Sequence, residues 1–197
     1  MKICFITDTH QGARGGSNVF REYFRQYYRD FLFPAMKEQN VDMIIHGGDF
    51  FDSRNAISLA DIDYVLNEFI PLVEEYEIPM KVITGNHDTH FKNTNRINSL
   101  TLLKSSSLVE VIENDLRVLE FENDLKIVLC PWINIQNKDN LIPQLKNYAN
   151  KKTILLGHFE INDFKMYKNS ILSSGGLDQA IFKGFRKVLS GHFHHSS

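Results

Sequence analysis

The chain has 197 residues, of which 43% are apolar, and it carries a formal net charge of −2 with a pI near 6.4. A chain of this length and composition can bury one sizeable core, so we expect a single folded domain. The charge balance excludes a broad basic face for nucleic acid, so a nucleic-acid substrate would need bound metal or a partner to hold it. No apolar run is long enough to span a bilayer or to act as a signal peptide, so we expect no membrane association and a cytoplasmic protein.

In the first half of the chain, short apolar runs alternate with long segments of helical spacing. The helical segments are Val19–Gln39 and Ser58–Tyr76, where apolar residues recur every three or four positions. Strand-like runs rich in Ile, Val, Leu and Phe occupy residues 2–7, 41–46, 79–84, 125–130, 153–157 and 185–190. The order strand, helix, strand, helix, strand predicts right-handed βαβ units and a parallel sheet.

The pattern changes after Ser107. The runs 109–111, 116–121 and 125–130 are separated only by polar turns, which predicts hairpins and therefore a second sheet with antiparallel pairing. Together the elements predict a two-sheet sandwich with helices outside. Cys4 and Cys130 lie inside strand-like runs, which favours buried thiols over a disulfide or a metal pair.

An aromatic stretch, VFREYFRQYYRDFLF, lies within the first helical segment. Its apolar positions Phe20, Phe24, Tyr27 and Phe31 predict a helix packed on the sheet. Two alternatives remain open at this point: a partner-helix surface, and a nucleic-acid face formed by tyrosines with the interleaved Arg21, Arg25 and Arg29.

Nearly every predicted strand ends in polar residues of one chemical kind. These clusters are Thr7-Asp8-Thr9-His10, His46-Gly47-Gly48-Asp49, Gly85-Asn86-His87-Asp88, Gly157-His158 and Gly191-His192-Phe193-His194. Because the carboxyl ends of strands in open α/β sheets meet in one crevice, we expect the five clusters to form a single site. Carboxylate, imidazole and amide donors without thiolate suit manganese, iron, zinc or magnesium.

The number of candidate ligands favours two metal ions over one. There are seven, too many for one tetrahedral ion: Asp8, His10, Asp49, Asn86, His158, His192 and His194. Asp49 is the natural bridge, since one carboxylate can offer an oxygen to each ion. Two such ions stabilise both the attacking and the leaving oxygen in displacement at phosphorus, and a water or hydroxide held between them would be the nucleophile.

Other polar residues around the clusters fit supporting roles. His87 would face the substrate, where it could protonate a leaving group, and Asp88 could orient its imidazole. Arg14 and Arg54 follow the first two clusters and could meet phosphate. His46, His90 and His195 only flank the motifs, and we expect them at the surface or behind the ligands.

These blocks, in this order and across essentially the whole chain, resemble those of the calcineurin-like metallophosphoesterases: D-x-H, GD, GNHD, GH and GHxH. The resemblance implies an α/β fold, an αββα four-layer sandwich of two mixed sheets flanked by helices, with a dinuclear centre. By the family pattern, one ion would be held by Asp8, His10, Asp49 and His194. The other would be held by Asp49, Asn86, His158 and His192, and His87 would be the catalytic histidine.

Within that superfamily, the segments TDTHQG, GGDFFDSR, CPW and GHFEINDF with MYK soon after are most similar to the nuclease subunits of SbcCD-type double-strand-break repair complexes, and above all to their phage branch. This resemblance implies manganese-dependent exo- and endonuclease action on DNA under an SbcC-type coiled-coil ATPase partner. It also implies a homodimer through helices near Ile62–Phe69 and Ile97–Leu103.

The chain departs from that family in two ways. Asp52 stands where some relatives carry a second active-site histidine, which puts a direct role for this position in doubt. Relatives also continue past the last motif, so we expect residues 1–197 to be a nuclease domain without its DNA-capping and partner-binding regions.

Three other functions remain as alternatives. A protein phosphatase would carry GDxxDRG and GNHE, whereas this chain has GDFFDSR and GNHD. A phosphodiesterase for cyclic nucleotides or other small molecules shares the metal motifs. An inactive scaffold would have lost ligands, and none is substituted here.

Overall fold

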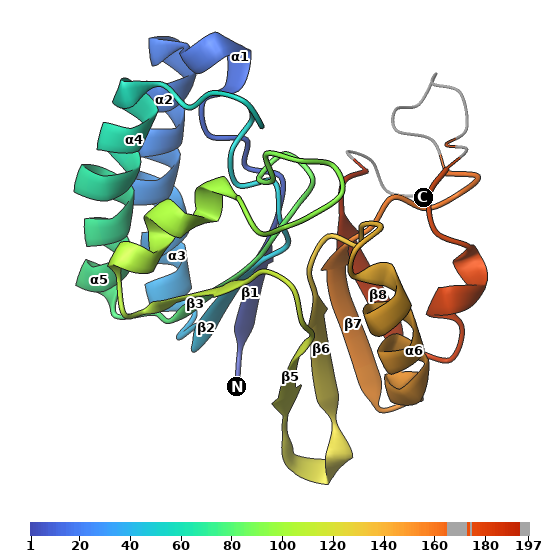
Figure 1. Cartoon of the computed structure of the whole chain (residues 1–197). Coiled ribbons are helices and arrows are strands. Elements are labelled where there is room, and N and C mark those ends of the chain that lie inside the picture. The colour runs from blue at the N-terminus through green and yellow to red at the C-terminus, as the bar shows by residue number, and fades with distance from the viewer. Residues whose placement is uncertain (165–172, 174, 194–197) are drawn as a thin grey trace.

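The computed structural model describes residues 1–164, 173 and 175–193 (Figure 1). Within these residues, strands form two four-stranded sheets, with the orders β1-β2-β3-β4 and β5-β6-β7-β8. The strands of the first sheet are β1 (Ile3–Ile6), β2 (Met43–His46), β3 (Met80–Ile83) and β4 (Val109–Ile112). Those of the second are β5 (Arg117–Glu120), β6 (Lys126–Cys130), β7 (Thr153–His158) and β8 (Lys187–Gly191).

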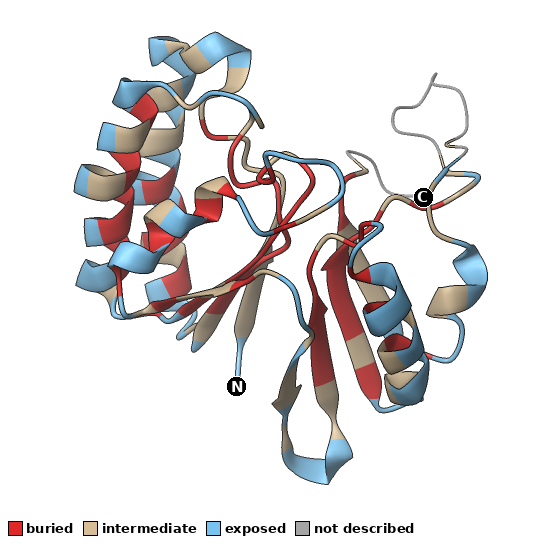
Figure 2. Cartoon of the chain, in the orientation of Figure 1, coloured by how far each residue is buried: buried red, intermediate tan, exposed pale blue. Residues whose placement is uncertain are grey.

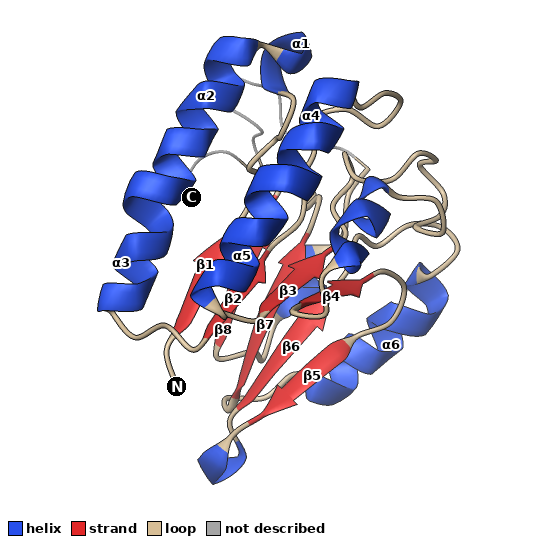
Figure 3. Cartoon of the chain, turned by 90° about the vertical axis from the view of Figure 1, so that its left-hand side faces the viewer, coloured by secondary structure: helices blue, strands red, loops and turns tan. Residues whose placement is uncertain are grey.

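Two long helical segments cover the outer face of the first sheet, and α6 covers that of the second (Figures 1 and 3). A short turn, α1 (Ala13–Gly16), precedes the first segment, which comprises α2 (Asn18–Gln26), the π-helical turn η1 (Tyr27–Leu32) and α3 (Phe33–Glu38). The second comprises α4 (Leu59–Tyr64), the π-helical turn η2 (Val65–Phe69) and α5 (Ile70–Tyr76). The remaining helical elements are η3 (Ser99–Ser105), η4 (Glu122–Asp124), α6 (Lys138–Tyr148) and η5 (Gln179–Phe182).

Figure 2 colours the buried residues red on the strands and helices, and these residues form three clusters between the layers. Phe33, Phe69 and Met80 belong to a core between the first sheet and its helices. Ile45, Ile83 and other residues, among them Leu129 and Leu156, pack the two sheets against each other. A third cluster, with Leu141 and Leu145, joins the second sheet to α6. The predicted four-layer αββα architecture is therefore confirmed.

The prediction for residues 109–111 is wrong. This run is β4, which pairs in parallel with β3 at the edge of the first sheet. Only β5 and β6 form the expected antiparallel hairpin, while β6, β7 and β8 run parallel. The second sheet is therefore mixed, whereas the named strands of the first sheet are all parallel. A polar turn between 112 and 117 cannot show whether the chain turns back on itself or crosses to the second sheet.

Both long helical segments contain a proline, and both change to a π turn just before it. Pro34 follows η1 and Pro71 follows η2. Proline has no N–H to donate and its ring collides with the carbonyl four residues earlier, so a locally wider turn lets the helix continue. The predicted segments Val19–Gln39 and Ser58–Tyr76 are therefore confirmed as helical through their prolines.

The buried face of the first helical segment differs from the predicted one. Tyr28, Leu32 and Met36 pack inward, whereas Tyr23 and Phe31 are 65% and 63% exposed. Of the predicted stripe, Phe20, Tyr27 and Phe31 are exposed and point away from the sheet. Phe24, its fourth member, packs against the core as predicted. Aromatic residues occupy both faces of this helix, which is why spacing alone selected the wrong stripe.

Two of the three arginines that were considered for a nucleic-acid face, Arg21 and Arg25, are paired with acids. Arg21 binds the buried Asp61, and Arg25 binds Glu22 and Glu68. This neutralisation weighs against the alternative of a nucleic-acid face on this helix, because guanidinium groups held by carboxylates are less available to phosphate.

Two further expectations can be compared with the fold. Cys130 is buried and Cys4 half-buried, and both are free thiols, as expected. Among the described helices, none combines the length and the apolar character that crossing a bilayer requires.

Candidate metal centre

The five polar clusters lie where parallel strands of both sheets end, at one end of the sandwich (Figure 1). Asp8 and His10 follow β1, Asp49 follows β2, and Asn86 and His87 follow β3. From the second sheet come His158, the last residue of β7, and His192, which follows β8. The predicted convergence of these residues is observed. His194 and His195, together with the MYK segment, lie outside the described residues.

One group of donors is fully buried. Single ligand atoms of Asp49, His158 and His192 lie within 4.8 Å of one another. Asn86 completes the group, since its Oδ1 lies 2.9 Å from His158 Nε2 and 2.8 Å from His192 Nδ1. Asp49 Oδ2 lies 3.2 Å from the same His158 Nε2. We call this set the buried donor group.

The proton positions around His158 fit a cation in the buried donor group. His158 Nδ1 donates to the carbonyl of Gly47 at 2.9 Å, which leaves Nε2 of a neutral ring with a lone pair. That lone pair faces the acceptor oxygens of Asp49 and Asn86. Burial alone would lower the pKa of His158, but the Asp49 carboxylate outweighs it and raises the pKa to about 9. The arrangement is thus stable only with a proton or a metal cation among these atoms.

A second donor group is more open. Single ligand atoms of His10, Asp49 and His87 lie within 4.8 Å of one another, and both histidines are half-buried. Asp8 Oδ1 lies 3.9 Å from His10 Nε2. Burial lowers the pKa of His10, against the pull of Asp49, so the ring is held neutral, as a metal ligand must be. We call this set the open donor group, and Asp49 belongs to both groups.

The backbone of the ligand loops is held in an unusual conformation. Asp8, His10, Asp49 and His192 all have positive φ, from 47° to 83°. Non-glycine residues rarely adopt this region, and such strain tends to occur at functional sites. The conformation is stabilised from nearby: Thr7 Oγ1 and the His192 N–H both donate to the Asp8 carboxylate.

Glycine at position 85 allows the loops after β2 and β3 to touch. A Cβ on Gly85 would lie 2.2 Å from the backbone nitrogen of Asp49, which is far inside contact distance. The absence of a side chain therefore lets the carboxylate of Asp49 approach Asn86, and the His87 N–H donates to Asp49 Oδ1 at 2.7 Å.

Asp52, not Asp88, orients the His87 ring. His87 Nδ1 donates to the backbone carbonyl of Asp52 at 2.5 Å. Asp88 is buried and accepts from the backbone N–H groups of Phe51 and Gly85, so it fixes the loops after β2 and β3. Burial and the neighbouring Asp49 raise its pKa to about 7. The expectation that Asp88 holds the imidazole is therefore wrong.

Asp52 also reaches the open donor group through its side chain. Its Oδ1 lies 3.3 Å from His10 Nδ1, so one residue contacts a candidate ligand and positions a candidate acid. Sequence reasoning left the role of this position open. Its distance of three residues from Asp49 was the available signal.

The two arginines proposed for phosphate differ. Arg54 Nη1 is buried without a hydrogen-bond partner among the described residues, and burial lowers its pKa while the field of Asp49 opposes this. An unpaired guanidinium nitrogen near the shared carboxylate suits an incoming phosphate. Arg14 is exposed and stands over the Phe20 ring at 6.0 Å. Of the flanking histidines, His46 is fully buried behind the ligands and His90 is exposed.

Sequence reasoning used Trp132 only as part of a family motif and assigned it no role. Its ring centroid lies 6.0 Å from that of His158 and 5.6 Å from that of His192. It follows β6, the strand beside β7, which by topology places it at the same end of the sheet. The position after a strand was the signal that could have marked it.

A sandwich of this topology with imidazole, carboxylate and amide donors at its strand ends defines the metallophosphoesterase class. The chain belongs to the calcineurin-like phosphoesterase family, whose model matches residues 1–196. Membership implies divalent metal ions at the donor groups, and the donor chemistry described above fits them.

Comparison with known proteins gives relatives that are named as nuclease subunits or as DNA-repair proteins. The chain is 31% identical to exonuclease subunit 1 of Enterobacteria phage T4, over 98% of this chain and 55% of that protein. It is 27% identical to the DNA double-strand break repair protein Mre11 of Saccharolobus solfataricus, over 98% and 49%. It is 24% identical to the SbcD component of the nuclease SbcCD of Staphylococcus saprophyticus, over 99% and 57%. The chain thus spans about half the length of these relatives.

Proposed function

We propose that the chain is the catalytic domain of a metal-dependent phosphodiesterase that cleaves DNA, as an exo- and endonuclease subunit in recombination and double-strand-break repair. The observation that carries this proposal is the position of Asp49, whose carboxylate belongs to both donor groups. Two ions sharing one carboxylate are the arrangement suited to displacement at phosphorus. Manganese is the metal we favour, with magnesium, iron or zinc as the alternatives.

The residues of the chain divide the remaining work. Bound ions would polarise the phosphoryl group and lower the pKa of water. His87, held by the Asp52 carbonyl, has its Nε2 free of that contact and can hydrogen-bond the phosphoryl group or protonate the leaving oxygen. Arg54 can meet a nonbridging phosphate oxygen through its unpaired nitrogen.

The relatives support DNA as the substrate and a partner protein. Mre11 is by its name a DNA double-strand break repair protein, and SbcD is by its name one component of the SbcCD nuclease. We propose an SbcC-type coiled-coil ATPase as the partner, which would also help an acidic chain to hold DNA. We propose that the protein acts in the cytoplasm, that of the host cell if a phage encodes it.

We propose a homodimer through the helical surface near Ile62–Phe69 and Ile97–Leu103. Many apolar residues of these segments, such as Phe69 and Leu103, are in the core. The exposed apolar side chains on or beside them are Ile97, 48% exposed, and Leu59, 84% exposed. A dimer would therefore use these two residues, Leu59 at the start of α4 and Ile97 just before η3 (Figure 3).

The test is cleavage of an end-labelled DNA duplex with manganese, beside a chelator control and the Asn86→Ala protein. We expect manganese-dependent products that both controls lack. Cyclic nucleotides and p-nitrophenyl phosphodiesters run in parallel identify a small-molecule phosphodiesterase. Cleavage of these alone, with two ions bound and no product from duplex or single-stranded DNA, would overturn the proposal.

A further inference from the structure

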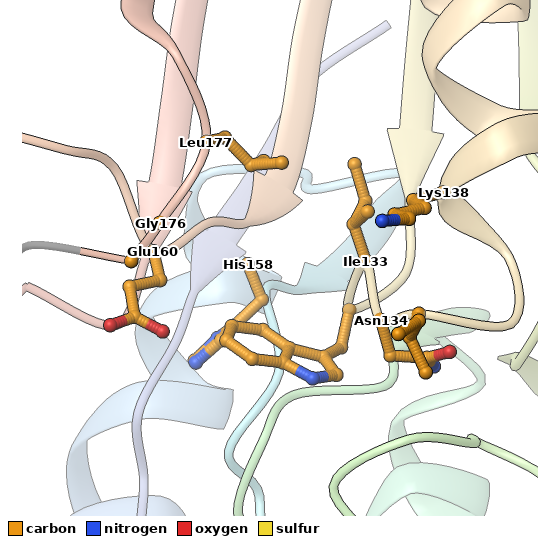
Figure 4. Close-up of a pocket in the computed structure, with 10 residues that line it drawn as sticks. Ile133, Asn134, Lys138, His158, Glu160, Gly176 and Leu177 are labelled. Atoms are coloured by element: carbon orange, nitrogen blue, oxygen red, sulfur yellow. The ribbon is translucent and has the colours of Figure 1, made fainter.

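A cavity of about 350 Å³ lies beside the buried donor group (Figure 4). His158 lines both the donor group and this cavity, so the two are adjacent. The other walls come from the segment after β6, the start of α6 and the segment after β7, and they include Trp132, Ile133, Lys138, Glu160 and Leu177. None of these five residues has a role in the reaction proposed above.

Trp132 is a rigid wall of this cavity because both backbone groups of the residue are held. Its N–H donates to the carbonyl of Thr84 at 2.8 Å. Its carbonyl accepts from the side-chain amides of Asn95, at 2.8 Å, and Asn137, at 3.0 Å. The indole is partly exposed and lies against the ring of His158. A large aromatic face is thus fixed next to the site where a phosphate would be cleaved.

A cluster of buried asparagines supports this segment. Asn95 is 1% exposed, Asn134 7% and Asn137 9%. The Asn134 side chain donates to Asn95 Oδ1 at 2.9 Å, and Asn137 Oδ1 accepts from the Asn134 backbone N–H. Buried amides are costly unless they are hydrogen-bonded, and these bond one another and the Trp132 carbonyl. Buried amide groups thus hold the backbone of Trp132, in addition to the packing of its side chain.

The remaining walls have the chemistry of a base site. Ile133 and Leu177 are apolar, whereas Lys138 and Glu160 lie on opposite sides of the cavity (Figure 4). Lys138 forms no ion pair with an acid among the described residues and could meet a neighbouring phosphate. Glu160 accepts from Ser173 Oγ and has further acceptor capacity for the amino or imino edge of a base.

We propose that this cavity receives one unpaired nucleobase of the DNA strand whose phosphate is held at the metal centre, and that the base stacks on Trp132. Every base has a π face, so a fixed indole binds bases with little regard to sequence, worth about 1–3 kcal/mol per base by alanine substitution. The inference rests on the proposed function, because it concerns the DNA substrate of the same site. It adds that the end base of the bound strand is no longer paired with its complement.

The first test uses the unaltered chain and needs no turnover. Trp132 is the single tryptophan of the chain, so intrinsic tryptophan fluorescence reports on this cavity alone. Thymidine 5′-monophosphate and 2-deoxyribose 5-phosphate share phosphate and sugar and differ only in the base. With magnesium present, we expect the nucleotide to quench the fluorescence and to bind about 5- to 150-fold more tightly by calorimetry. Equal affinities with unchanged fluorescence would overturn the inference.

The second test compares two substrates that share one leaving group, thymidine 5′-(p-nitrophenyl phosphate) and methyl p-nitrophenyl phosphate. We expect the unaltered chain to prefer the nucleoside ester in kcat/KM, Trp132→Ala to reduce this preference about tenfold or more, and Trp132→Tyr to retain most of it. Tyr23→Ala, which removes an exposed aromatic ring from α2, is the matched control.

The outcomes separate the two proposals. No turnover of either ester or of DNA counts against the proposed function. Turnover of both esters with a preference that Trp132→Ala leaves unchanged counts against the base site alone. Damage to the neighbouring histidines would slow both esters equally and so would not imitate the expected change in their ratio.

Discussion

The two donor groups share Asp49 but differ in origin and burial. The buried donor group takes His158 and His192 from the second sheet and Asn86 from the first, and its members are 0–9% exposed. The open donor group comes from the first sheet only, and its two histidines are half-buried. One ion would therefore join the sheets, while the other would face substrate. Motifs of similar composition thus lie in two groups of different burial.

The largest effect is expected where the two groups meet. Asp49→Asn replaces the shared carboxylate by a neutral amide of the same shape, so both groups lose their common anion. We expect occupancy of both ions to fall and DNA cleavage to drop below detection. Elemental analysis of the protein after dialysis against manganese measures the first effect. Retention of two ions per chain would show that Asp49 is not the bridge.

A variant at His87 distinguishes two roles for this residue in the open donor group, metal ligand and general acid. If it transfers a proton, His87→Ala keeps both ions and loses roughly 10²–10⁴ in rate. If it is a ligand, the variant loses an ion together with activity. Metal content and kcat measured on the same preparation distinguish these results, and His90→Ala, which removes an exposed histidine, is the control.

The location of both donor groups was predictable from the sequence, because glycine and polar residues after each apolar strand mark loops that converge at one end of a sheet. The predicted strands and both long helices are present, and six of the seven predicted ligands lie together, the seventh being outside the described residues. Burial of the two groups was not predictable, because it depends on how the second sheet closes over the first.

The errors have local physical causes. Residues 109–111 carry the same alternation whether they pair with β3 or with the next run, β5, so periodicity could not assign their sheet. Helix α6 was missed because it is mostly polar, contains Pro143, and buries few residues, Leu141 and Leu145 among them. The partner of His87 is a backbone carbonyl, that of Asp52, which no pattern of side chains can indicate.

Removing one ligand from each group should affect one ion at a time. Asn86→Ala takes an oxygen from the buried donor group, and His10→Ala takes an imidazole from the open one. We expect each variant to bind one of the two ions more than tenfold more weakly. Removing even a group that hydrogen-bonds a metal ligand typically lowers metal affinity by about 10- to 100-fold. Calorimetric titration with manganese gives both affinities. Two equally weakened sites in either variant would mean that the groups are not separate.

The ion of the buried group should also stabilise the fold more, since it joins the sheets. Binding to the native state alone raises stability with metal concentration. We therefore expect manganese to raise the Tm of His10→Ala by more than that of Asn86→Ala. Thermal unfolding of both variants with and without manganese measures this difference, and equal shifts would contradict it.

The smallest effect concerns His46, buried behind both groups. Its Nδ1 accepts from the Gly48 N–H and its Nε2 donates to Thr9 Oγ1, so the ring is neutral. Burial lowers its pKa from 6.5 to about 3. Between these two pH values the unfolded chain binds a proton at His46 that the native chain does not bind. The contribution of the neutral His46 ring to stability is therefore fully present above pH 6.5 and is lost as pH falls toward 3.

His46→Gln removes that proton and should flatten the acid side of the stability curve. Denaturant unfolding of the metal-free protein between pH 4 and 7 should show a slope difference from the parent approaching about 1.4 kcal/mol per pH unit. His90→Gln, at an exposed histidine, is the matched control. If the free energies of unfolding of His46→Gln and of the parent changed with pH in parallel, the buried ring would take up its proton in the folded state. The acid sensitivity of the fold would then come from the donor groups.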